Sequence, residues 1–127
     1  MDRILVIDGD KLTRWSLGEV FRQDGYEVGE AATWEEALVL ARKTEFRLIL
    51  ADFEIQDEQS LSRLKEVQDL QASVPILILS SDPREQMEAT LRPLGRFRIV
   101  DKPYGMDLIR AAAREALQDK AQGGQRS

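Results

Sequence analysis

Four polar residues of this chain come just after short apolar runs that predict β-strands. They are Asp8, Asp52, Ser80 and Lys102, and the runs are 3–7, 46–51, 75–79 and 97–100. Because the carboxyl ends of parallel strands meet at one edge of a sheet, we expect the four side chains to share one pocket. Two carboxylates, a hydroxyl and an ammonium group in one pocket have the chemistry to handle a phosphoryl group.

The composition of the 127-residue chain excludes several kinds of site. It has no cysteine, which removes disulfides and thiolate metal sites, and no histidine, which removes the commonest general base and zinc ligand. A net charge of −5 argues against direct nucleic-acid binding, which depends on phosphate neutralisation by Lys and Arg. Since no signal peptide is recognisable and no apolar stretch approaches about 18 residues, we expect a cytoplasmic protein without a membrane span.

The apolar runs alternate with segments of helical periodicity, as in a parallel α/β sheet. A second strand is expected at 26–30, and the helices are expected at 11–24, from Thr33, at 58–71, from Asp82 and at 106–119. The third and fourth strands are continuously apolar, whereas the second and fifth carry charges and are expected at the edges. We predict one doubly wound domain over 1–120 with strand order 2-1-3-4-5, and a flexible tail or linker over 121–127.

The motifs at the strand ends resemble those of a known family. They are Ile-Asp-Gly-Asp at 7–10, Leu-Ala-Asp at 50–52, Leu-Ser-Ser at 79–81 and Asp-Lys-Pro at 101–103. Over about residues 2–119 the chain resembles the response-regulator receiver domains of two-component signalling, which have a flavodoxin-like (βα)5 fold. Segments 14–17 and 25–28 are also similar to receivers that precede a σ54-activating ATPase and a DNA-binding domain.

The resemblance implies a phosphoacceptor signalling domain and not an enzyme. Asp52 would accept a phosphoryl group from a sensor histidine kinase, while Ser80 and Lys102 contact the phosphoryl oxygens. Asp8 and Asp52 would hold Mg²⁺, with Asp10 as a further candidate ligand. Phosphorylation would change the conformation of the fourth helix, fifth strand and fifth helix. This change would reach an output domain or partner, for example in transcription regulation. The partner could also be a second copy of the chain in a homodimer.

Asp10 has a second interpretation, which we favour: it can cap the first helix through the Thr13 amide. The sequence also departs from the family pattern, and two of the departures bear on the function. Gly9 stands where receivers have a second acid that normally binds the metal directly, and Ile99 replaces the usual Tyr or Phe.

Gly9 and Ile99 favour an alternative function, in which a pseudo-receiver of the same fold acts as a phosphorylation-independent interaction module. The acceptor set of Asp52, Ser80 and Lys102 favours the phosphoacceptor instead. A third alternative is a flavodoxin-like cofactor binder. Such a protein needs a phosphate loop rich in glycine and hydroxyl groups after the first strand, where the acids at 8 and 10 would repel an anion.

Overall fold

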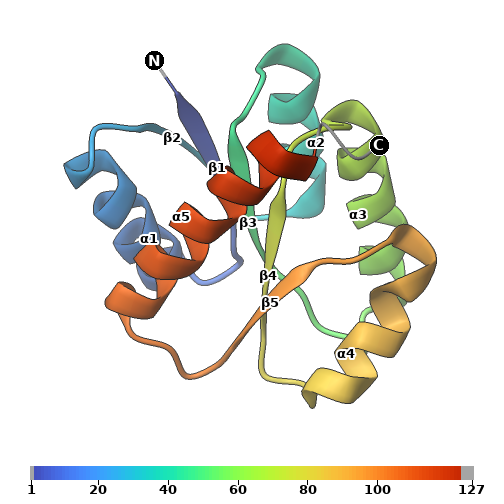
Figure 1. The fold of residues 1–127 in the computed structure, drawn as a ribbon. Helices are drawn as coiled ribbons and strands as arrows, with labels where there is room; N and C mark the ends of the chain where they lie inside the picture. Colours follow the sequence, from blue (N-terminus) through green and yellow to red (C-terminus); the bar gives the residue numbers. More distant parts are fainter. Residues whose placement is uncertain (1, 124–127) are drawn as a thin grey trace.

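The structure is a computed structural model that describes residues 2–123, in which a parallel sheet lies between two layers of helices (Figure 1). The strands are arranged in the order β2-β1-β3-β4-β5, so the predicted flavodoxin-like topology is confirmed. They are β1 (Arg3–Ile7), β2 (Glu27–Ala31), β3 (Leu48–Asp52), β4 (Ile76–Ser80) and β5 (Arg98–Asp101).

Five α-helices connect and follow the strands. They are α1 (Lys11–Gln23), α2 (Trp34–Lys43), α3 (Glu58–Leu70), α4 (Arg84–Leu91) and α5 (Met106–Gly123), with a 3-10 turn, η1, at Arg92–Leu94. The first three helices begin at capping side chains, as Asp10, Thr33 and Asp57 each accept a main-chain N–H of the first turn. The side chain of Asp10 therefore makes the Thr13 contact that the sequence predicted.

Alternate strand residues divide the core into two clusters. Ile4 and Val6 of β1 belong to the cluster covered by α1 and α5, whereas Leu5 and Ile7 belong to the one covered by α2, α3 and α4. The ribbon shows α1 and α5 side by side on one face of the sheet (Figure 1). Burying such a side chain fully contributes about 1.5–3 kcal/mol, so the hydrophobic effect holds the strand ends together in space.

Every strand except β1 begins and ends later than predicted. The predicted ends at 30, 51, 79 and 100 become 31, 52, 80 and 101. The reason is the pairing between strands: Asp52 pairs in register with Leu79, and Ser80 with Asp101. Asp52 and Ser80 are thus the last residues of their strands, not loop residues that follow them, and the ladder restrains both.

The chain continues as a helix beyond the predicted end of the domain. The fifth helix was expected to end at 119 but extends to Gly123, so residues 121–123 are helical and not a loose tail. Residues 124–127, the rest of the predicted tail or linker, lie outside the described residues. The domain boundary near residue 120 stays a prediction. No helix within 2–123 has the length and apolar character to cross a membrane.

Candidate functional site

The four residues singled out by the sequence lie at the carboxyl edge of the sheet. Asp8 follows β1, Asp52 ends β3, Ser80 ends β4, and Lys102 follows β5. These four strands lie next to one another, in the order β1, β3, β4 and β5. The parallel arrangement therefore collects two acids, a hydroxyl and an amine from segments nearly a hundred residues apart in sequence.

Lys102 and Asp52 are in direct contact. The Nζ atom of Lys102 lies 2.5 Å from Oδ1 of Asp52, and the two side chains are 27% and 23% exposed. The main-chain N–H of Lys102 donates to the carbonyl of Ser80 at 2.8 Å, and the peptide bond to Pro103 is cis. A hydrogen-bonded cation thus neutralises Asp52, the residue expected to act as nucleophile.

Asp8 is buried, and one of its carboxylate oxygens has no partner. Oδ1 accepts the N–H of Asp10 at 2.8 Å, whereas Oδ2 is buried without a hydrogen bond among the described residues. Burial raises the pKa of Asp8; the Asp10 N–H opposes this shift, the charge of Asp52 adds to it, and Lys102 lowers it. A buried oxygen without a donor is costly, so this atom is suited to receive a cation.

The donor set fits a magnesium ion with two carboxylate ligands. Carboxylate oxygens of Asp8 and Asp52 are the hard ligands that Mg²⁺ prefers, and such sites commonly use one or two carboxylates together with waters and phosphate. Across residues 2–123 no group of three potential metal-ligating side chains is assembled. Asp10 is engaged elsewhere, since its Oδ2 accepts from both the N–H and the hydroxyl of Thr13, which lower the pKa of Asp10.

Ser80 is fully buried, and its hydroxyl oxygen accepts the N–H of Asp82 at 2.9 Å. The hydroxyl proton stays available for donation, because this contact uses only a lone pair. The carboxylate of Asp82 in turn accepts the N–H of Ile55 at 2.9 Å. Asp82 therefore links the loop after Ser80 to the loop after Asp52. Sequence reasoning missed this contact, and no local signal predicts it because the two residues are 27 positions apart.

Tyr104 is a second residue that sequence reasoning missed. Its half-buried side chain packs against the cluster beneath α1 and α5. Burial raises the pKa of Tyr104 to about 12, and the charges of Asp8 and Asp52 add to the shift. The one signal in the sequence is its position, two residues after Lys102.

Comparison with known proteins identifies the family. A family model described as "Response regulator receiver domain" matches residues 4–114. The chain belongs to this family. It is 28% identical over 116 residues to sporulation initiation phosphotransferase F of Bacillus subtilis, a match that covers 91% of this chain and 94% of that protein. It is also 28% identical to the transcriptional regulatory protein ZraR of Escherichia coli, where it covers 90% of this chain but spans only 26% of ZraR.

Solved receiver structures have the same fold. A CheY-like receiver domain of Methanospirillum hungatei superposes with a TM-score of 0.86 at 22% identity, over 97% of this chain and 98% of that one. A response regulator of Burkholderia pseudomallei, solved with a phosphorylated aspartic acid and a calcium ion, has a TM-score of 0.79 at 26% identity. That match covers 98% of this chain and 73% of the Burkholderia protein. The described fold is therefore that of a receiver domain.

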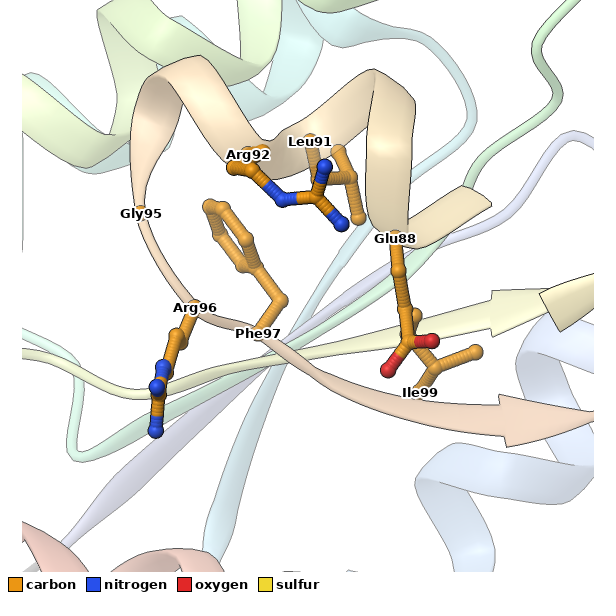
Figure 2. A pocket seen from close by; sticks show the side chains of 7 residues that line it. All are labelled: Glu88, Leu91, Arg92, Gly95, Arg96, Phe97 and Ile99. Carbon is orange, nitrogen blue, oxygen red and sulfur yellow. The ribbon is translucent and has the colours of Figure 1, made fainter. Parts of the chain in front are cut away.

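The two departures from the receiver pattern differ in their setting. Gly9 is exposed, its φ is not in the left-handed region, and a Cβ atom built on it would meet only the carbonyl oxygen of Ala32, at 3.7 Å. A side chain therefore fits at position 9. Ile99 is 8% exposed and lines a pocket between α4 and β5 with Leu91 and Phe97 (Figure 2).

Proposed function

We propose that this chain accepts a phosphoryl group on Asp52 from the phosphohistidine of a sensor histidine kinase and passes a conformational change to an output domain or partner protein. The observation that carries the proposal is the contact of Lys102 with Asp52 at the edge of the sheet where Asp8 and Ser80 also lie. Names of relatives that include a phosphotransferase and transcriptional regulators agree with a signalling role.

The residues of the site can carry out each part of the phosphoryl transfer. A carboxylate oxygen of Asp52 attacks the phosphorus, an O–P bond forms, and the P–N bond to the kinase histidine breaks with its electron pair going to the imidazole. Lys102, already on Asp52, then pairs with a phosphoryl oxygen. The Ser80 hydroxyl donates its free proton to another of these oxygens. The product is an acyl phosphate on Asp52.

Asp8 and Asp52 would hold Mg²⁺, and the unpartnered Oδ2 of Asp8 is the atom that favours this assignment. When bound, Mg²⁺ supplies positive charge that offsets the charge on the phosphoryl oxygens. We assign Asp10 to the helix rather than to the metal, because its Oδ2 accepts two hydrogen bonds from Thr13. With Gly9 contributing no carboxylate, we expect a weaker magnesium site than two adjacent acids would provide.

Exposed apolar side chains near the starts of α1 and α5 support kinase docking. Leu12, Trp15 and Leu108 are 71%, 53% and 52% exposed, and they lie on the N-terminal parts of α1 and α5. These helices begin directly after β1 and shortly after β5, so both start at the edge of the sheet where Asp52 ends β3 (Figure 1). Exposed large apolar side chains are candidates for interaction surfaces, and a kinase helix that carries the phosphohistidine is the partner we propose for them.

The relay would pass through α4, β5 and α5. The contact of Ser80 with Asp82 connects the end of β4 to the segment that leads into α4. Arg84, the first residue of α4, donates to the carbonyl of Ile99 at 2.9 Å and pairs with Asp101. A shift of Ser80 toward the phosphoryl group therefore has a route to β5. The pocket of about 590 Å³ beside Ile99 lies on this route (Figure 2). A homodimer through this face would use the same relay.

A pseudo-receiver is the second candidate function. Gly9 favours it, since it supplies no acid beside Asp8, and so does Ile99, since it cannot act as an aromatic switch. In that case Lys102 and Asp52 would form a permanent ion pair, and the partner surfaces would act without phosphorylation.

Intact-mass measurement decides between the two candidates. We expect the native chain, incubated with acetyl phosphate and Mg²⁺, to gain one phosphoryl group that hydroxylamine removes. Asp52→Asn should gain none, and Asp57→Asn, which changes an acid of the adjacent loop but can keep the cap of α3, should label as the native chain does. Equal labelling of native chain and Asp52→Asn, or no labelling of either, would contradict the phosphoacceptor function.

A further inference from the structure

Contacts from β2 and α1 hold both main-chain polar groups of Asp8. The N–H of Asp8 donates to the carbonyl of Ala31 at 3.0 Å. The carbonyl of Asp8 accepts from Nη1 of Arg14 at 2.9 Å, and Nε of the same guanidinium pairs with Glu30 at 3.2 Å. Arg14 therefore connects Asp8 to Glu30, the residue before Ala31.

Glu30 is held firmly enough to serve as this anchor. Its Oε1 faces Arg14, and its Oε2 accepts from Arg22 at 2.7 Å, so each carboxylate oxygen has a guanidinium partner. The hydrogen bond from Arg22 is the main reason that the pKa of Glu30 is lowered, with a smaller contribution from Arg14. The side chain of Arg14 is only 15% exposed. Partial burial, together with the second contact of the Arg14 guanidinium to the Asp8 carbonyl, makes this ion pair more restrictive than an exposed one.

The next residue in the chain makes this restraint important. Gly9 follows Asp8, and glycine gives the backbone more freedom than any other residue. The orientation of the Asp8 carboxylate also depends on the N–H of Asp10, which occupies Oδ1 and leaves Oδ2 unpartnered. If the segment 8–10 moved, Oδ1 would lose its hydrogen bond to the Asp10 N–H, and Oδ2 would no longer be the only carboxylate oxygen of Asp8 without a partner.

We propose that Arg14, anchored by Glu30, is a positioning residue that keeps Asp8 in the orientation that leaves Oδ2 free for a metal ion. This inference rests on the proposed magnesium site. Arg14 touches neither the phosphoryl group nor the ion in this scheme, and it acts through the carbonyl of Asp8. Groups that orient metal ligands in this way typically change metal affinity by about 10- to 100-fold when they are replaced.

The test compares Arg14→Lys with Arg22→Lys. Lysine keeps the positive charge but lacks the planar fork that bonds a carbonyl and a carboxylate together. Calorimetric titration with MgCl₂ should show about 10-fold weaker binding for Arg14→Lys. Arg22→Lys changes the other partner of Glu30, away from Asp8, and should bind close to the native value. Glu30→Gln is a milder change at the residue that anchors Arg14, and its Mg²⁺ affinity should lie between those of the two other variants.

A second measurement does not depend on metal. In the metal-free protein the Asp10 amide should exchange its hydrogen faster in Arg14→Lys than in the native chain and in Arg22→Lys, because its acceptor, Oδ1 of Asp8, is no longer held in place. Faster exchange of this amide in Arg14→Lys alone supports the positioning role. Unchanged exchange overturns it.

The remaining outcomes separate the inference from the proposed function. If Arg14→Lys binds Mg²⁺ as the native chain does, Arg14 acts at most by charge and the inference is wrong. If Arg22→Lys loses as much affinity, the effect is a general loosening of α1 on β2, which also overturns it. If Asp8→Asn binds Mg²⁺ as well as the native chain does, the magnesium site itself fails, while amide exchange still decides whether Arg14 positions Asp8.

Discussion

Placing an acid at position 9 tests the magnesium site most directly. The structure removes the main objection to Gly9→Asp, because the φ of Gly9 is not in the left-handed region and a Cβ atom there has ordinary contact with Ala32 only. The substitution therefore adds a carboxylate next to Asp8 without demanding a strained backbone. Its effect should be electrostatic.

The expected gain in Mg²⁺ affinity depends on how exposed residue 9 is. Two unit charges 4 Å apart interact by about 1 kcal/mol in water and about 4 kcal/mol at an effective dielectric of 20, and a divalent ion doubles these values. Since residue 9 is exposed, the lower limit applies, which gives about 2 kcal/mol before the carboxylate loses hydration. We expect a net gain of about 10-fold in Mg²⁺ affinity, which corresponds to about 1.4 kcal/mol.

In the absence of metal, the new charge should destabilise the folded protein. In the metal-free protein it lies near Asp8 and Asp52, so the free energy of unfolding should fall by a fraction of the same Coulomb energy. Added Mg²⁺ should restore the loss, because the ion binds only the folded chain.

Calorimetry with MgCl₂ and denaturant unfolding with and without the ion measure both effects. Gly9→Ala is the matched control, because it changes the backbone freedom of residue 9 in the same way but adds no charge. If Gly9→Asp binds Mg²⁺ no more tightly than Gly9→Ala, residue 9 does not face the ion, and Asp10 as a ligand or a magnesium-free docking role becomes the better interpretation.

Three further substitutions test the electrostatics of the pocket. Asp8→Asn should stabilise the metal-free protein more at pH 7 than at pH 4, because burial raises the pKa of Asp8 above 3.8 and its contribution to stability falls as the pH rises through that raised pKa. Denaturant unfolding measures this, and an equal change at both pH values would contradict it. Tyr104→Phe should remove the tyrosine ionisation expected at about pH 12 in an absorbance titration and should reduce the loss of stability between pH 10.0 and about 12. A titration curve of the variant that keeps this step would assign it to another residue. Lys102→Ala should slow phosphorylation, and Mg²⁺ should raise its thermal midpoint at least as much as that of the native chain, since the ion replaces a lost cation beside Asp52; a smaller rise would refute this reasoning.

Local sequence determined most of the fold. Alternation of apolar runs with helical periodicity, together with charges on the second and fifth runs, predicted five parallel strands in the order that the structure has. Capping residues are equally local, so Asp10 and Thr33 were found at the starts of α1 and α2. The ends of β3 and β4 were misplaced by one residue, because pairing between strands, and not the apolar run, decides where a strand stops.

The types of the site residues and the edge they share also came from the sequence, since parallel strands bring their carboxyl ends together. Only the tertiary structure decided how these residues are paired. Lys102 contacts Asp52, while Oδ2 of Asp8 is left without a partner. The link from Asp82 to Ile55 and the contact of Arg14 with the Asp8 carbonyl join segments by packing. Such contacts depend on distances of a few ångströms and on burial, which appear only when the helices and strands are assembled.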